Sequence, residues 1–197
     1  MSNSSTSCSF PVPVRQPLPS ICKRVKNVML LNQYKNSQGL YDITDFLSKV
    51  NLSLLGTSLQ DDRKLSTSAQ TLTNMLIEMK GWVADIPAVV QAQRFGNTAF
   101  RTWHKRATQA ADEFIAGLLP EEHQGVANEI KTYWLESFGN NTRIDYGTGH
   151  ELCFITMLTA LTKLGVFQTT PQEYQVLALD VFRAYLNLVR ELQKVLN

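Results

Sequence analysis

The stretch from Phe138 to Glu151 gathers the side chains of this chain that are best suited to chemistry. It carries a guanidinium, a carboxylate, a phenol, a hydroxyl and an imidazole, on Arg143, Asp145, Tyr146, Thr148 and His150. Gly147 and Gly149 flank Thr148 where a helix is expected to begin. Backbone amides at a helix start attract anions, glycines let a ligand come close, and an arginine can pair with a phosphate. This composition indicates a phosphate site.

A structural role for the same stretch remains open. In this alternative it forms an ordered turn in which Asp145 caps the following helix and Arg143 makes an ion pair within the protein. A Gly-Thr-Gly run that no lysine follows does not by itself distinguish the two interpretations.

A second segment, Arg94 to His104, mixes charge with aromatic surface. Asn97 or Thr98 is suited to cap a helix there. The side chains predicted as core anchors are Phe95, Phe100 and Trp103, while Arg94 and Arg101 are expected to be solvated or ion-paired. A functional role for this segment is the alternative.

Familiar catalytic patterns are missing from the sequence. His150 and Glu151 begin like a zinc-protease helix, but the second histidine would fall at 154, which is Phe154. The sequence has no nucleophile elbow and no phosphate-loop lysine. Cys153 lies in an apolar helical run and is predicted to be an inert core thiol. We therefore predict no metal ligands and no covalent catalysis.

Helices are the elements that must position these segments. Apolar residues recur at three- and four-residue spacing over 38–55, 68–82, 97–118, 121–136 and 150–164. A last helix is predicted after Thr170, with Pro171 at its first position. Between 138 and 149 this spacing breaks, which predicts an irregular loop. No segment alternates long enough to compete as a strand, so the predicted fold class is all-α.

The predicted last helix keeps an apolar stripe almost to the end of the chain. The stripe consists of Leu179, Phe182, Tyr185, Leu186, Val189, Leu192 and Leu196. Because such a stripe must be covered, we expect another element to pack on it.

Length and composition set the class of protein. A chain of 197 residues fits one domain of roughly 150 residues with a tail, and a formal net charge of +2 is a poor match to nucleic acid. Its longest uncharged apolar run, 152–162, is much shorter than the roughly 20 residues that cross a bilayer, so we expect no membrane span. Residues 1–20 are rich in serine and proline and are predicted to form a flexible arm before a helical domain over 21–197.

Two runs resemble the signature segments of the phosphotyrosyl phosphatase activator (PTPA) family, which activates serine/threonine protein phosphatase 2A. They are Arg94-Phe-Gly-Asn-Thr-Ala-Phe-Arg-Thr-Trp103 and Gly139-Asn-Asn-Thr-Arg-Ile-Asp-Tyr-Gly-Thr-Gly-His-Glu151. The resemblance implies a multi-helix fold of the PTPA type, a cytoplasmic and often nuclear location, and direct contact with the phosphatase catalytic subunit. It also implies an ATP- and magnesium-dependent activation chaperone.

The resemblance assigns roles within the second run. The family's nucleotide contacts correspond to Arg143, Thr148 and Gly149, which is the stretch that the composition indicates as a phosphate site. Members are also described as peptidyl-prolyl cis/trans isomerases acting on proline-containing peptides. Rotation about such a bond breaks no covalent bond, so a pocket that stabilises the twisted amide can suffice. Asp145, Tyr146 and His150 are the residues that we expect near it.

The sequence departs from the family after the last helix. There the family continues with a Gly-Val-Trp-Gly-Leu-Asp-Asp segment that brings the magnesium ligands, and this chain ends before it. From this we expect residues 21–197 to be the N-terminal and middle part of a PTPA-type domain that is incomplete at its C-terminus. The alternative function is a truncated helical interaction fragment that binds the phosphatase without catalysis.

Overall fold

The computed structural model describes residues 22–90 and 96–196, and this part of the chain contains helices and no strand. The predicted arm over residues 1–20, together with Arg94 and Phe95, lies outside the described residues. The helices are α1 (Val28–Lys35), α2 (Gln38–Ser53), α3 (Thr67–Asp85), α4 (Ala99–Leu118), a 3₁₀ turn (Glu121–Val126), α5 (Ala127–Glu136), α6 (Thr148–Lys163), α7 (Pro171–Val176), a π-helical segment (Leu177–Phe182) and α8 (Arg183–Leu196). The all-α prediction is confirmed.

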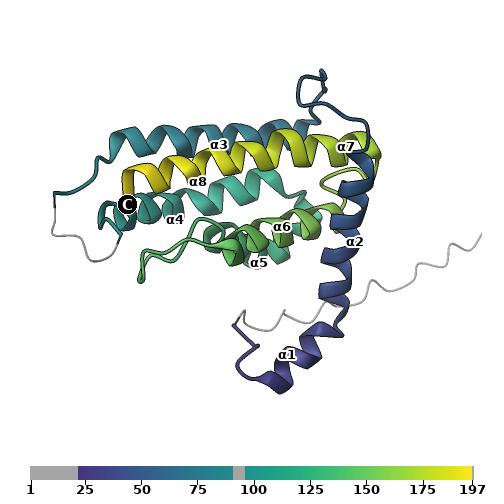
Figure 1. The fold of residues 1–197 in the computed structure, drawn as a ribbon, viewed down its shortest axis with the longest axis horizontal. Coiled ribbons are helices and arrows are strands. Elements are labelled where there is room, and N and C mark those ends of the chain that lie inside the picture. The colour runs from purple at the N-terminus through teal and green to yellow at the C-terminus, as the bar shows by residue number, and fades with distance from the viewer. Residues whose placement is uncertain (1–21, 91–95, 197) are drawn as a thin grey trace, which may run out of the picture.

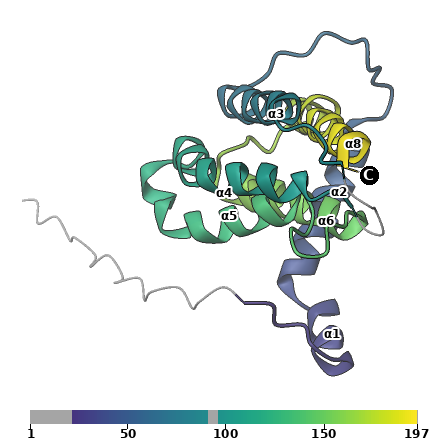
Figure 2. The ribbon, with the colours of Figure 1, turned by 90° about the vertical axis from the view of Figure 1, so that its left-hand side faces the viewer.

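The helices form two layers (Figures 1 and 2). In one layer α3 lies along the rod made by α7, the π-helical segment and α8, and in the other α4, α5 and α6 pack together. At one end α2 crosses the layers and contacts α6 and α7, and α1 lies beyond it, away from the body. The connection between α5 and α6 emerges from the second layer.

Most of the buried side chains form one core between the two layers. Its largest fully buried members are Trp103, Trp134, Tyr185, Phe138, Phe154 and Phe167. The Trp103 indole N–H donates to the carbonyl oxygen of Met79 at 3.1 Å, so a polar atom from α4 is satisfied by α3 inside this core. Phe138 stands at the end of α5, and its burial anchors the loop that follows.

The expected partner of the last helix is α3. Tyr185, Leu188, Val189 and Leu192 are buried, whereas Leu179, Phe182 and Leu186 of the predicted stripe are only partly buried. The side chains that the rod buries form a neighbouring stripe, which keeps three- and four-residue spacing through the π-helical segment: Tyr174, Leu177, Val181, Tyr185, Leu188 and Leu192.

One predicted helix is divided in the structure, and one helix has no counterpart in the prediction. Residues 121–136 do not form one helix, because a 3₁₀ turn with Pro120 before it and Gly125 within it precedes α5. Before Gln38, where no helix is predicted, α1 forms, and the Asn27 side chain accepts from the amide of Leu30 at 2.9 Å. The cap is a local signal that apolar spacing does not reveal.

The polar segment before α3, 61–66, is held against the rod made by α7, the π-helical segment and α8. Arg63 Nε lies 2.8 Å from Asp180 Oδ2, and the two side chains are only 8% and 19% exposed. In a second contact, the Ser66 hydroxyl donates to the carboxylate of the buried Glu173 at 2.7 Å. These bonds satisfy charges that would otherwise be costly next to the core.

Candidate functional site

The connection from Gly139 to Gly147 is a closed turn built around Asn140. The Asn140 amide donates to the carbonyl of Asp145 at 3.0 Å, and Ile144 donates back to Asn140 at 2.7 Å. The Asn140 side-chain oxygen accepts from the amides of Thr142 and Arg143 at 3.0 and 2.9 Å. An asparagine that bonds its own following backbone stabilises a tight turn, so the loop has a defined shape before any ligand arrives.

Close backbone contacts make this shape strict. Gly139 has a φ of +118°, and a Cβ there would lie 2.9 Å from the carbonyl oxygen of Asp145. Ile144 has a φ of +53°, in the left-handed region that β-branched residues rarely adopt. A Cβ on Gly96 would come within 2.6 Å of the Ile144 side chain. The surroundings therefore hold Ile144 in a strained conformation. Because Gly96 and Gly139 have no Cβ, Ile144 can pack against the first and the backbone of Asp145 against the second.

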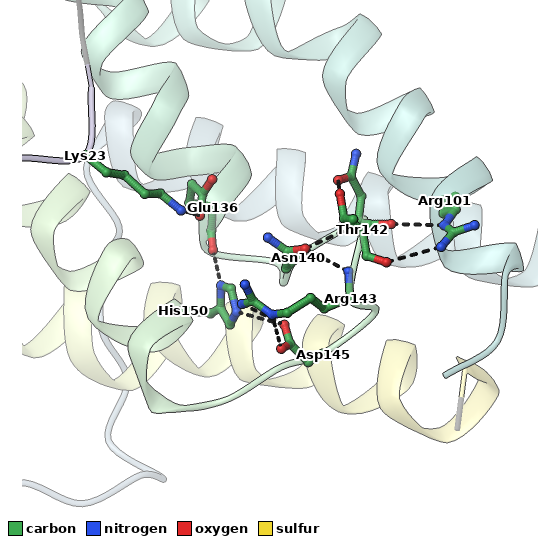
Figure 3. A network of polar contacts seen from close by, with 9 residues as sticks. Lys23, Arg101, Glu136, Asn140, Thr142, Arg143, Asp145 and His150 are labelled. Carbon is green, nitrogen blue, oxygen red and sulfur yellow. Dashed lines mark hydrogen bonds and ion pairs between the residues drawn. The ribbon is translucent and has the colours of Figure 1, made fainter. Parts of the chain in front are cut away.

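Arg101 connects the two segments singled out from the sequence. From the first turn of α4, its guanidinium donates to the carbonyl oxygens of Asn141 and Thr142, both at 3.1 Å. Figure 3 shows Arg101 facing the loop at Thr142. Phe100 and Trp103 are core anchors, as predicted. The sequence predicts that Arg101 is solvated or ion-paired. Instead, its side chain fixes a loop that lies 40 residues further along the chain.

Asn97 completes the first segment. Its side chain is 1% exposed and accepts from the amide of Ala99 at 3.0 Å, while also exchanging hydrogen bonds with the backbone of Val89. Asn97 thus supports the start of α4 and ties the preceding chain to it. The N-cap position itself is occupied by Thr98, whose side chain makes no capping hydrogen bond.

Arg143 and Asp145 point toward each other on the exposed side of the loop (Figure 3). Arg143 Nε lies 2.5 Å and Nη2 3.2 Å from the two carboxylate oxygens. This hydrogen bond lowers the pKa of Asp145 and raises that of Arg143. The ion pair of the structural alternative is therefore present. The other half of that alternative is wrong, because α6 has Gly147 at its N-cap and no side-chain cap.

Thr148 and Gly149 occupy the exposed first turn of α6. A Cβ at Gly147 or Gly149 would meet nothing within 4 Å, and neither glycine has a positive φ. Neither packing nor backbone geometry therefore requires glycine at these positions. The open space there would let a group from outside approach the helix start. Amides in a first helical turn carry partial positive charge, so phosphate chemistry fits the residues present.

Tyr146 turns its hydroxyl inward. The hydroxyl lies 2.8 Å from that of Tyr185, which donates to the carbonyl oxygen of the buried Ser137 at 2.7 Å. Because Tyr185 has one proton to give and the carbonyl only accepts, Tyr146 must be the donor to Tyr185. Burial raises the pKa of Tyr146 to about 12. The pair therefore stays protonated and holds the end of the loop to α8.

The imidazole of His150 is oriented by a hydrogen bond to the end of α5. Its Nδ1 donates to the carbonyl oxygen of Glu136 at 2.5 Å, and its Nε2 faces Asp145 Oδ1 at 3.8 Å. The ring also stacks on Tyr146, with centroids 5.7 Å apart. Asp145, Tyr146 and His150 thus lie together in the structure.

An apolar cavity of about 40 Å³ opens beside these residues. It lies between α4, α8 and the loop, and its lining residues are Phe100, Phe138, Ile144, Asp145, Tyr146, Val189, Leu192 and Gln193. His150 does not line it. The volume suffices for about one water molecule, so the cavity is a recess in the wall of the site.

Neither a metal-ligand cluster nor a membrane span is found in the described part of the chain. Residues 22–90 and 96–196 contain no group of three His, Cys, Asp or Glu side chains placed to hold a metal ion. Cys153 is only partly buried, so it is not the core thiol that the sequence predicts, although burial raises the pKa of its thiol. Within the same residues no helix is both long and apolar enough to span a bilayer.

Two residues of the site escape a reading of the sequence. Arg101 resembles any surface arginine, and only its position opposite the loop gives it a role. Tyr185 lies in an apolar stripe, which predicts a core residue. A tyrosine buried in a core usually needs a partner for its hydroxyl, and this need is the one sequence signal that points to its role.

Comparisons with known proteins identify the family of this chain. The family described as "Phosphotyrosyl phosphate activator (PTPA) protein" matches residues 21–197. The serine/threonine-protein phosphatase 2A activator of Drosophila melanogaster is 33% identical over 180 residues, which cover 91% of this chain and 45% of that protein. Activator 1 of Schizosaccharomyces pombe is 33% identical over 162 residues, covering 82% and 49%.

A solved structure has the same fold. The crystal structure of the PP2A phosphatase activator Ypa1 superimposes with a TM-score of 0.78 at 25% identity, over 89% of this chain and 56% of that one. The chain spans about half the length of the curated relatives named above.

Proposed function

The chain belongs to the PTPA family, and on this premise we propose that it activates serine/threonine protein phosphatase 2A through direct contact with the catalytic subunit. The observation that carries the proposal is the meeting of the two signature segments. Arg101 and Gly96 from the first contact the loop of the second, so both form one surface rather than two unrelated turns. A preorganised exposed loop is suited to recognise a partner or its bound ligand.

ATP is the cofactor that we propose for this surface. Arg143 would bind phosphate charge, and Thr148 and Gly149 would offer a hydroxyl and an amide at the start of α6. The ion pair of Arg143 with Asp145 is exposed, with side chains 64% and 48% accessible, and such pairs contribute little. Arg143 can therefore exchange its carboxylate partner for a phosphate at low cost. ATP bound there would place its phosphate charge next to Arg143 and the amides of the first turn of α6.

The test compares two exposed arginines in a phosphatase assay. Addition of the chain with ATP and magnesium should raise the activity of the purified catalytic subunit, and Arg143→Ala should abolish the ATP-dependent gain. Arg106→Ala is the matched control, because Arg106 pairs with Asp85 on another face and should leave the gain intact. If the gain persists in Arg143→Ala, the assignment of the phosphate contact is wrong.

Prolyl isomerisation is the second function that we propose, and the apolar recess beside Asp145 and Tyr146 favours it. An X-Pro peptide lying across the mouth of this recess would lose water around its amide, which lowers the barrier to rotation. A protease-coupled assay on a prolyl peptide measures this directly. A rate equal to the uncatalysed one would remove this activity from the chain.

The alternative interaction function predicts a third outcome. Pull-down of the catalytic subunit without activation or isomerase activity would identify the chain as a binding fragment. A cytoplasmic and nuclear location, which we also propose, is checked by imaging the tagged chain in cells.

A further inference from the structure

Residues 22–36, which we call the basic segment, differ from the rest of the chain in charge. They contain Lys23, Arg24, Lys26 and Lys35 and no acidic residue. Lys23 lies 3.3 Å from Glu136, and within residues 22–90 and 96–196 no carboxylate pairs with the other three. The segment thus presents cations that the rest of the described chain does not neutralise.

Exposed apolar side chains accompany these cations. The side chains of Val28 and Met29 in α1 are 73% and 65% exposed, and that of Val25 just before the helix is 48% exposed. None of its residues is buried, and it projects from the body in both views (Figures 1 and 2). A helix of this length is marginal by itself in water, yet α1 is capped at its start by Asn27. Such a helix gains stability when a partner covers its outer face.

The outer face also carries primary amides. A shallow groove along α1 is lined by Val28, Met29, Asn32, Gln33 and Asn36. Sinking this face into a bilayer would bury amides without partners, whereas a protein surface can offer backbone and carboxylate groups to bond them. The combination of cations, apolar side chains and amides therefore favours an acidic protein surface over lipid.

The basic segment is also next to the candidate site. Lys23 pairs with the Glu136 side chain, and the carbonyl oxygen of Glu136 binds His150, so the segment begins where the site ends (Figure 3). A partner bound at the loop would have the basic segment at its edge.

We propose that the basic segment docks on an acidic surface of the phosphatase catalytic subunit, as a second contact beside the loop. This inference rests on the proposed function for the identity of the partner, but it concerns different residues. Opposite charges would speed association and make it sensitive to salt, while Val28 and Met29 would supply the apolar contact.

Binding of the purified catalytic subunit, measured by titration calorimetry at low and moderate salt, tests the proposal. Met29→Asp should raise the Kd at least tenfold, because it puts a like charge against the acidic surface and removes an apolar contact. The control is Ile77→Asp on α3, another exposed apolar residue outside the segment, which should change the Kd less than twofold. Lys26→Glu with Lys35→Glu should weaken binding and reduce its salt dependence.

The outcomes separate the two proposals. Equal Kd values for the Met29, Ile77 and parent chains overturn the docking of the basic segment and leave the proposed function standing. Absence of binding by the parent chain overturns both. Parent binding to vesicles with roughly 30% phosphatidylserine, lost in the Met29 variant, would identify lipid instead and also overturn the protein assignment. Unchanged circular dichroism of each variant verifies that folding is intact.

Discussion

The loop from Gly139 to Gly149 and the basic segment are both exposed and both charged, but they are held in opposite ways. The loop is fixed by Arg101, by the Asn140 turn and by contacts that tolerate no added carbon at Gly139. The basic segment has a capped helix and buries none of its α1 residues. A fixed loop can present a few polar groups to a small ligand, whereas an exposed apolar helix is suited to a large surface. The difference indicates two recognition roles on one molecule.

Gly139→Ala should produce the largest effect. The substitution forces a Cβ to 2.9 Å from the carbonyl oxygen of Asp145 at a φ of +118°, so we expect a loss of about 2–4 kcal/mol in the free energy of unfolding. Denaturant unfolding measures it. Gly147→Ala is the control within the same loop, because nothing lies within 4 Å of its Cβ. Equal stabilities for both variants would mean that the loop is no more constrained than the basic segment.

Tyr185→Phe should come next. It leaves the carbonyl oxygen of Ser137 without its donor and removes the 2.8 Å contact of the Tyr146 hydroxyl, so we expect a loss of about 1–3 kcal/mol. Tyr174→Phe, which changes another buried tyrosine of the same rod, should cost less. Thermal unfolding of the two variants decides the matter, and a larger effect at Tyr174 would contradict the role given to Tyr185.

His104→Gln should change how stability depends on pH. Burial lowers the pKa of His104 in the folded protein below its value of about 6.5 in the unfolded chain. The unfolded state then binds the proton more readily, so this contribution to stability is present above pH 6.5 and is lost as the pH falls toward the folded pKa. Unfolding measured from pH 7.5 to 5 should therefore show a shallower decline in the variant. An unchanged slope would rule out this residue as a source of it.

Asn27→Ala should have the smallest effect on global stability. The substitution removes the cap of α1, which is worth about 1 kcal/mol to a helix, but α1 buries nothing that the core needs. Hydrogen exchange should accelerate over residues 28–35 while the unfolding midpoint stays unchanged. A shifted midpoint would show that α1 is part of the cooperative fold and would weaken the contrast with the loop.

The amino-acid sequence was enough for the fold class and for singling out the loop of the candidate site. Apolar spacing predicts α2, α3, α4 and α6 within a few residues, because one face of each helix must be buried. The Gly139 to Glu151 run stands out because its glycines and polar residues do not fit any helical pattern.

Tertiary structure decided the rest, because the relevant contacts join residues far apart in the chain. Arg101 acquires its role from carbonyl groups about 40 residues away, and Tyr185 from Ser137 and Tyr146. The side chains that α8 buries are those that meet α3. The exposure of α1 is likewise a consequence of where α2 places it. Local sequence determines which face of a helix is apolar, but only packing determines what that face meets.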